Sequence, residues 1–222
     1  TVRLWVNYDL KEALEEVATR CGTNALPVVA DMTKRDEVAR VVEEGLARFG
    51  RIDVWVNNAG QGITRLPSQL TEEDIDEMVR LNVKTALFGM QAILPYFKQR
   101  GEGHIVNISS MLGRVPRNII RSAYSAAKHF LNALTANFRT EVQQTHHGIQ
   151  ISLVSPPGVK TEFGVNARHG GIDSRTVAEF QEVDDTVAVI ASVIDTRRPD
   201  VYTWPGSHQR VVEYFSSIAG DP

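Results

Sequence analysis

Short apolar runs rich in β-branched residues alternate with longer stretches of helical periodicity along nearly the whole chain. The runs fall at residues 2–6, 25–30, 52–56, 104–108, 150–154 and 200–203. Between them, apolar positions recur at helical spacing in residues 11–21, 36–49, 72–99, 123–144 and 184–194. This alternation is typical of βαβ units, in which helices cover both faces of a parallel sheet. We therefore predict an α/β fold with a doubly wound parallel sheet.

Length and charge narrow the classes of protein further. The 222 residues, 42% apolar and 23% charged, suit one large globular domain over residues 1–222. A net charge of −3 provides no basic field for nucleic acid, so none is expected as a partner. The single cysteine, Cys21, excludes a disulfide framework and favours a reducing, cytoplasmic setting. The longest mainly apolar run, residues 187–194, is far below the about 20 residues of a membrane span, so no membrane partner is expected.

Tyr124 and Lys128 stand four residues apart in the motif Tyr-Ser-Ala-Ala-Lys. On a helix, this spacing places both side chains on one face, about one turn apart. An ammonium group beside a phenol lowers the pKa of the phenol, which suits the phenol to proton transfer. The pair alone is common in helices, so its meaning depends on the motifs around it.

Two predicted strands run directly into short polar motifs. The run 52–56 continues into Asn-Asn-Ala-Gly at residues 57–60, whose small residues allow a flat ligand to approach the backbone. The run 104–108 continues into Ser-Ser at residues 109–110, shortly before Tyr124. Because parallel strands end at the same edge of a sheet, we predict that these groups gather there.

Together the motifs resemble the short-chain dehydrogenase/reductase family (SDR). The family pattern is matched in order by Asp31 in Val-Ala-Asp-Met-Thr, by Asn-Asn-Ala-Gly at residues 57–60, by Asn82 in Leu-Asn-Val-Lys-Thr, by Ser110, and by Tyr124 with Lys128. The resemblance extends over about residues 1–206. It implies a single Rossmann-like domain that passes hydride between NAD(P) and the carbonyl or alcohol carbon of a small molecule.

The resemblance also implies a role for each matched residue. Tyr124 would protonate the carbonyl oxygen or deprotonate the alcohol, and Ser110 would hold that oxygen. Lys128 would bind the nicotinamide ribose and lower the pKa of Tyr124, while Asn82 would anchor a water that relays the proton. The remaining cofactor contacts that the family pattern implies are Asp31 at the adenine, Asn58, Ala59 and Gly60 beside the adenosine ribose, and Val159 and Thr161 in the loop facing the nicotinamide amide.

Three features depart from the family pattern. No Gly-x-x-x-Gly-x-Gly turn occurs, and aligning residues 1–6 with the family's second strand leaves its first strand, phosphate-binding turn and first helix unrepresented. After the sixth strand of the family, Pro157 takes the place of a glycine in the motif that ends at Thr161. The interval from Ser110 to Tyr124 is one residue longer than usual.

These departures keep three functional hypotheses open. The leading one is an NAD(P)-dependent oxidoreductase. Its rival is a catalytically inactive or partner-binding remnant of the same fold, which only the missing glycine-rich turn favours. An epimerase or dehydratase that uses the same tyrosine and lysine is disfavoured by the short C-terminal tail. For the cofactor we favour NADP over NAD, because Val-Asn-Tyr at residues 6–8 resembles reductases that accept NADP.

Three further segments carry expectations. Residues 163–182 have weak periodicity and adjacent glycines, which indicates a loop, a candidate substrate lid, over the carboxyl edge of the sheet. His146 and His147 have no cysteine or acidic cluster beside them, so no metal site is expected. In the family, the helices matching residues 72–99 and 123–144 pair across a two-fold axis, which implies a homodimer or homotetramer.

Overall fold

The computed structural model describes residues 3–6, 11–218 and 220. Its strands are β1 (Arg3–Val6), β2 (Ala25–Val28), β3 (Val54–Asn57), β4 (Gly103–Ile108), β5 (Ile149–Ser155) and β6 (Asp200–Tyr202). Its helices are α1 (Lys11–Cys21), α2 (Arg35–Phe49), α3 (Glu72–Val79), α4 (Thr85–Arg100), α5 (Ser122–Gln143), α6 (Val183–Thr196) and α7 (Ser207–Ile218). Each predicted strand lies within two residues of an observed one, whereas α7 was not expected.

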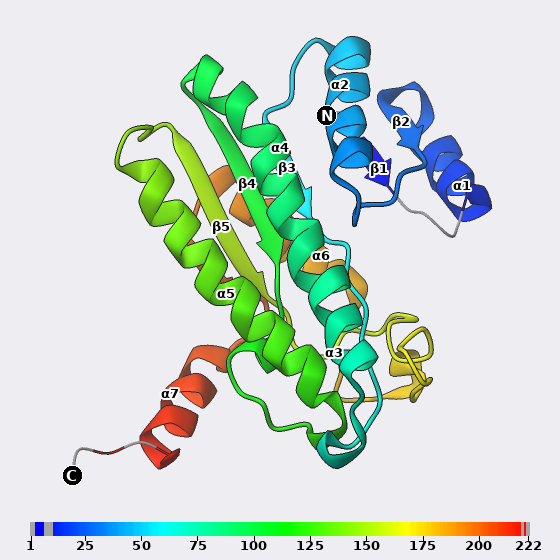
Figure 1. Cartoon of the computed structure of the whole chain (residues 1–222), viewed down its shortest axis with the longest axis vertical. Coiled ribbons are helices and arrows are strands. Elements are labelled where there is room, and N and C mark those ends of the chain that lie inside the picture. The colour runs from blue at the N-terminus through cyan, green and yellow to red at the C-terminus, as the bar shows by residue number, and fades with distance from the viewer. Residues whose placement is uncertain (1–2, 7–10, 219, 221–222) are drawn as a thin grey trace.

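The strands form parallel ladders, as the alternating pattern predicts. β1 pairs with β2, and a second group runs in the order β3, β4, β5, β6. No ladder joins β1 to β3 in the described part of the chain, so the single sheet that we expected consists here of two hydrogen-bonded groups. Each strand within a group is followed by a helix that returns the chain to the same end, and the carboxyl ends of β3, β4 and β5 therefore share one edge (Figure 1).

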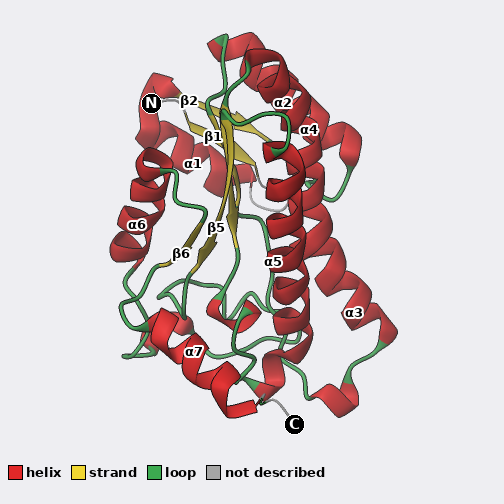
Figure 2. Ribbon diagram, turned by 90° about the vertical axis from the view of Figure 1, so that its left-hand side faces the viewer, coloured by secondary structure: helices red, strands yellow, loops and turns green. Residues whose placement is uncertain are grey.

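Helices lie on both sides of these strands, which confirms the Rossmann-like architecture. α2, α4 and α5 cover one face and α6 lies on the other (Figure 2). The larger core joins the two groups of strands, because Val28 of β2 and Val38 of α2 belong to the same apolar cluster as Ile105 of β4. A smaller cluster fixes α6 through Val193 against Val106 and Val154. Burial of these aliphatic side chains is the main stabilising contribution to the layers.

The stretch predicted as one helix over residues 72–99 is divided in three. A capping box starts α3: the Thr71 side chain accepts from the backbone of Asp74, and the Asp74 side chain accepts from the backbone of Thr71. A π-helical segment, Arg80–Lys84, then precedes α4. Helical periodicity is nearly the same in α- and π-helices over so short a stretch, so the pattern does not distinguish them. Asn82, a polar residue whose side chain is buried, lies within the π-helical segment.

A chain of buried polar groups crosses from β3 to α5. Trp55 Nε1 donates to Asn57 Oδ1 at 2.7 Å, and Asn57 Nδ2 donates to Asn107 Oδ1 at 2.7 Å. Asn107 Nδ2 in turn donates to Thr135 Oγ1 at 2.9 Å. A Cβ on Gly89 of α4 would lie 2.1 Å from Asn57 Oδ1, so this helix approaches the polar chain where only glycine fits. Each side-chain amide in this row of polar groups is thereby hydrogen-bonded.

The segment predicted as a lid, residues 163–182, consists of turns with one short 3₁₀ helix, Ser174–Thr176. It is held at two points, where Ile63 bridges Arg168 and Val159 bridges Gln181. Among the described residues, none of the helices has both the length and the apolar character to cross a membrane.

Candidate functional site

Tyr124, Ser110 and Lys128 meet at the carboxyl edge, where β4 ends and α5 begins. Tyr124 lies in the first turn of α5 and is 6% exposed, and Ser110 lies close enough to lower the pKa of its phenol. Ser110 Oγ also accepts from the backbone of Leu112, which fixes the turn after β4. Lys128 is 4% exposed and lies one turn further along α5, with its Nζ 5.6 Å from the centroid of the Tyr124 ring. The longer interval between Ser110 and Tyr124 is accommodated in the loop.

Burial controls the protonation of this pair. It raises the pKa of Tyr124 to about 12, against smaller lowering effects from the Ser110 hydrogen bond and the Arg121 charge. It also lowers the pKa of Lys128 to about 8. The expectation that Lys128 lowers the pKa of Tyr124 is therefore wrong for the ligand-free protein, because desolvation outweighs the neighbouring charge. At neutral pH the phenol is protonated and can act as a proton donor.

Lys128, Asn82 and Gly60 converge on the end of β3. Lys128 Nζ donates to the carbonyl of Ile108 at 3.0 Å. A Cβ built on Gly60 would lie 2.7 Å from Asn82 Oδ1 and 3.4 Å from Lys128 Nζ, so a side chain here would collide with Asn82 and contact Lys128. Asn58, Ala59 and Gly60 are exposed. The structure thus brings the strand-end motif and the Tyr-Lys pair to one place, as the sequence predicts.

The side chain of Asn82 holds the loop that follows this motif. Its Nδ2 donates to the carbonyls of Gln61 at 3.0 Å and Met78 at 3.1 Å, and its Oδ1 accepts from the backbone of Gln61 at 3.2 Å. Both N–H groups of the amide are used inside the chain, and its oxygen accepts one hydrogen bond.

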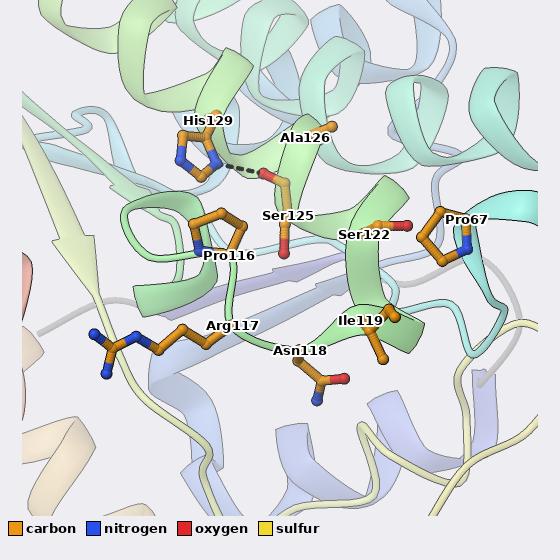
Figure 3. A pocket seen from close by; sticks show the side chains of 9 residues that line it. All are labelled: Pro67, Pro116, Arg117, Asn118, Ile119, Ser122, Ser125, Ala126 and His129. Atoms are coloured by element: carbon orange, nitrogen blue, oxygen red, sulfur yellow. Dashed lines mark hydrogen bonds between the residues drawn. The ribbon is translucent and has the colours of Figure 1, made fainter. Parts of the chain in front are cut away.

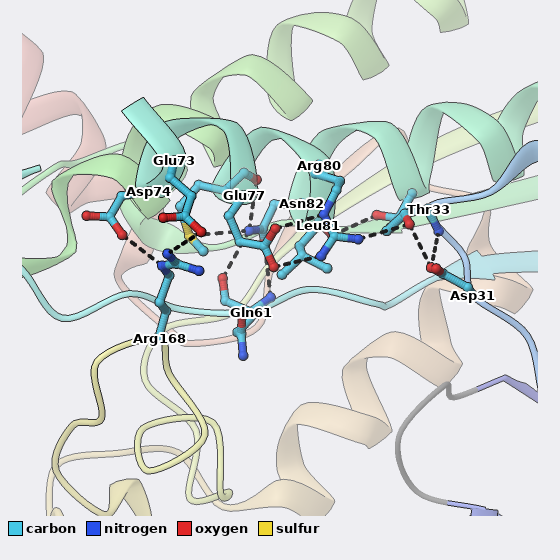
Figure 4. A network of polar contacts seen from close by, with 12 residues as sticks. Asp31, Thr33, Gln61, Glu73, Asp74, Glu77, Arg80, Leu81, Asn82 and Arg168 are labelled. Atoms are coloured by element: carbon cyan, nitrogen blue, oxygen red, sulfur yellow. Dashed lines mark hydrogen bonds and ion pairs between the residues drawn. The ribbon is translucent and has the colours of Figure 1, made fainter. Parts of the chain in front are cut away.

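Asp31 follows β2, and within the described part of the chain its side chain forms no hydrogen bond or ion pair with Tyr124. Its Oδ1 accepts from the backbone and hydroxyl of Thr33 at 2.9 and 2.7 Å, and Thr33 in turn accepts from Arg80 at 3.0 Å (Figure 4). Partial burial opposes ionisation, but these hydrogen bonds hold the pKa of Asp31 below its ordinary value. The network connects the first group of strands with the π-helical segment.

Val159 and Thr161 lie in the loop after β5. Residue 159 bridges Gln181, whose side chain exchanges hydrogen bonds with Thr203 after β6. The loop reaches the Ser110 turn through the backbone of Met111, which donates to the Pro156 carbonyl at 2.7 Å. Within the described part of the chain, neither Val159 nor Thr161 forms a hydrogen bond with Tyr124 or Lys128. The residues used to favour NADP, at positions 7 and 8, lie outside the described residues.

A second charged cluster joins the candidate lid to α3. Asp74 is fully buried and accepts from Arg65 at 2.7 Å, Arg168 at 2.7 Å and His169 at 2.8 Å. Figure 4 shows Arg168 reaching from the lid to Asp74 and Glu73. Although burial opposes ionisation, these donors together hold the pKa of Asp74 well below its usual range. The cluster was not expected, because its members are separated by about a hundred residues and form no local motif.

Arg121 is the buried guanidinium closest in sequence to Tyr124. It is 9% exposed and closes the 3₁₀ turn that enters α5. Its Nη1 donates to the carbonyl of Ile63 at 3.1 Å, and burial lowers its pKa against the opposing effect of Tyr124. Arg121 is buried, in contrast to the exposed Arg117 of the same loop.

A hollow of about 450 Å³ lies on the other side of the start of α5 (Figure 3). It is lined by Pro67, Pro116, Arg117, Asn118, Ile119, Ser122, Ser125, Ala126 and His129. Neither Tyr124 nor Ser110 lines it, so it is not where a carbonyl would meet the phenol.

Comparison with known proteins agrees with the geometry. The family described as short chain dehydrogenase matches residues 2–171. An uncharacterized oxidoreductase of Staphylococcus epidermidis is 30% identical over 177 residues, which cover 80% of this chain and 74% of the relative. The chain therefore belongs to the short-chain dehydrogenase family and is an oxidoreductase by membership.

Two solved structures show the same fold with cofactors bound. A short-chain dehydrogenase from Sphingobium yanoikuyae in complex with NADPH is 28% identical, covers 98% of this chain and 86% of its own, and superposes with a TM-score of 0.78. A short-chain dehydrogenase/reductase from Burkholderia phymatum in complex with NAD is 19% identical, covers 99% and 87%, and has a TM-score of 0.83. The neighbours thus bind either form of the nicotinamide dinucleotide.

Proposed function

We propose that the chain is an NAD(P)-dependent carbonyl reductase or alcohol dehydrogenase in which Tyr124 is the general acid and base. The observation that carries the proposal is the buried, protonated phenol of Tyr124, which lies beside Ser110 and one helical turn from Lys128. A phenol with a pKa of about 12 donates its proton to an oxygen that becomes an alkoxide. This protonation state favours the reductive direction.

The residues at the end of β3 fit a nicotinamide dinucleotide. Gly60 provides close backbone approach beside Lys128, and the Lys128 ammonium has no carboxylate partner among the described residues. Lys128 and the segment from Asn58 to Gly60 would hold the ribose groups, Val159 and Thr161 the nicotinamide end, and Asp31 the adenine end. When bound, the reduced cofactor supplies a hydride to the carbonyl carbon.

The chain's own residues then serve the oxygen of the substrate. Ser110 Oγ orients this oxygen, and Tyr124 transfers a proton to it as negative charge develops. The positive charge of Lys128 stabilises the tyrosinate that remains. Asn82 fixes the loop beside Lys128, and the backbone of the π-helical segment offers an anchor for a water that returns a proton to Tyr124.

Replacing the phenol with a phenyl ring tests the proposal. Tyr124→Phe removes one oxygen and no packing volume, so we expect turnover to fall about 10²–10⁴-fold while the melting temperature is retained. Reduction of a ketone is measured as oxidation of NADPH, with NADH in parallel, and Tyr214→Phe, at a half-buried tyrosine of α7, serves as the matched control. Parent-like turnover in Tyr124→Phe would remove Tyr124 from the reaction. We favour NADP over NAD, and we therefore expect the parent protein to have a higher kcat/KM with NADPH than with NADH.

The helices α4 and α5 are the surfaces that we propose for assembly into a homodimer or homotetramer. Phe130 on α5 is 54% exposed, whereas most large apolar side chains of these helices are covered. An aromatic ring at this position is suited to an interface. Light scattering on the parent and on Phe130→Glu tests the assembly: the variant should be monomeric.

A further inference from the structure

Three arginines surround the entrance between the loop after β3, the lid and α5, and they differ in how their charges are balanced. Arg65 and Arg168 both contact Asp74 at 2.7 Å. Arg121 forms no ion pair with any carboxylate of the described chain, and it donates a hydrogen bond to the neutral carbonyl of Ile63. Asp74 is already shared among Arg65, Arg168 and His169, so it does not balance the third arginine.

The place of Arg121 ties this unbalanced charge to the reacting end of the molecule. Arg121 and Tyr124 are three positions apart where the chain enters α5, a spacing that puts both side chains on one side of the helix. Phe163 of the lid lies beside both: its ring centroid is 5.4 Å from that of Tyr124, and its ring also packs against Gly62.

Two glycines make room for the guanidinium. A Cβ on Gly62 would lie 2.6 Å from Arg121 Nη1, and a Cβ on Gly171 would lie 2.9 Å from Nη2. The guanidinium therefore fits between the loop after β3 and the lid, where larger residues would displace it. One of its five N–H donors is used in the Ile63 hydrogen bond, which leaves donors for a ligand.

A buried cation without a counter-ion lowers the stability of the fold. A hydrogen bond to a backbone carbonyl could be donated by a neutral side chain, so it does not explain why a charged group lies here. We infer that Arg121 binds an anionic group of the substrate, so that the substrates are small carbonyl compounds that also carry a carboxylate. The planar fork of a guanidinium matches a carboxylate with two parallel hydrogen bonds. The carboxylate is unchanged by the reaction, because hydride and proton both add to the carbonyl group. This inference rests on the proposed function of Tyr124.

Matched acids and esters test the inference. Acetoacetate and levulinate are compared as substrates with their methyl esters, which keep the ketone and lose the charge. In the parent protein we expect kcat/KM to be at least about tenfold higher for the acids. Arg121→Met should reduce kcat/KM about 10- to 100-fold for the acids and change it less than about threefold for the esters. Arg121→Lys keeps the charge but not the planar guanidinium, so its kcat/KM for the acids should lie between those of the parent protein and of Arg121→Met.

Arg117→Met, an exposed arginine of the same loop, is the control and should leave the ratio of acid to ester unchanged. Equal losses for acid and ester in Arg121→Met, or no preference for acids in the parent, overturns the inference while the proposed function stands.

A binding measurement separates the two proposals. Thermal shift with each acid and ester requires no turnover: stabilisation of the parent by levulinate but not by its methyl ester, lost in Arg121→Met, supports the anion site even if no ketone is reduced. If levulinate and its ester shift the parent and Arg121→Met alike, the anion site is overturned. The melting temperature of Arg121→Met without ligand shows whether the variant is folded.

Discussion

Two buried charged regions lie at the same end of the molecule and differ in whether their charges are balanced. At Asp74 the carboxylate is fully buried, and two arginines and a histidine contact it. Around Tyr124, the buried Lys128 and Arg121 contact backbone carbonyls, and no described carboxylate pairs with either. Balanced charge stabilises the fold, whereas unbalanced buried charge lowers stability and is typical of a binding site. The contrast indicates that α3 and the lid are joined for structure and that α5 is arranged for ligands.

The strongest test of this contrast is Lys128→Met. We expect turnover to fall by about 10²-fold or more, because the group that stabilises the tyrosinate and binds the cofactor is lost. The free energy of unfolding at pH 7 should not decrease, since burial lowers the pKa of Lys128 to about 8 and the folded state therefore disfavours its charge. Steady-state kinetics and urea denaturation measure the two effects, with the exposed Lys98→Met as control. A loss of stability without a loss of turnover would reverse the assignment.

Asp74→Asn should give the opposite outcome. It leaves Arg65, Arg168 and His169 without their counter-ion, and we expect the free energy of unfolding to fall by about 2–3 kcal/mol. This loss is smaller than the roughly 3–5 kcal/mol expected when one partner of a fully buried ion pair is removed, because the two arginines are partly exposed to solvent. Turnover at a temperature where the variant is folded should change little. If Asp74→Asn lost its turnover while it remained folded, Asp74 would instead belong to the reaction.

Acid titration sharpens the same contrast. The folded-state pKa of Asp74 lies below its value in the unfolded chain, so the unfolded state binds the proton more readily. The stability that Asp74 contributes is therefore fully present above about pH 4 and is lost as the pH falls toward the folded-state pKa. Urea midpoints of the parent and Asp74→Asn should converge below pH 4. A constant difference would mean that the carboxylate charge is not what stabilises this region.

The pH dependence of kcat/KM at alkaline pH tests the region around Tyr124 and Lys128. Since the pKa of Lys128 is about 8, kcat/KM for reduction should decrease as the pH rises above 8, by about tenfold for each unit. Lys128→Arg, which keeps its charge, should move this decrease to higher pH. An unchanged limb in Lys128→Arg would assign the titration to another group.

Thr71→Ala gives the smallest effect. It removes one half of the capping box and leaves Asp74 with its cationic partners, so we expect a loss of about 1 kcal/mol. The difference between this variant and Asp74→Asn separates the contribution of the helix cap from that of the ion cluster. Equal losses would show that the arginines add nothing measurable.

The fold was largely predictable because its signals are local. Short β-branched runs marked each strand, and Thr71 followed by Asp74 marked the start of α3. α7 was missed since residues 207–218 follow a Pro-Gly turn and expose much of their apolar side, with Phe215 at 48%. The π-helical segment has no local signature.

The site was predictable where family motifs name its residues and not where contacts are long-range. Tyr124, Lys128, Asn82 and Gly60 come together as their motifs suggest. The pKa of Tyr124 was predicted in the wrong direction, since sequence spacing does not report burial. Arg121 and the Asp74 cluster depend on loops from distant parts of the chain, and no spacing rule brings Arg168 to α3.

The hydrogen-bonded row from Trp55 through Asn57 and Asn107 to Thr135 has a consequence for unfolding. To open β3 alone would leave buried amides of β4 without partners, and to detach α5 would do the same to Asn107. The strands and the helix that bear Gly60, Ser110 and Lys128 are therefore expected to exchange their amide hydrogens together, as one cooperative unit. The groups that we propose for catalysis would then persist or disappear as a set.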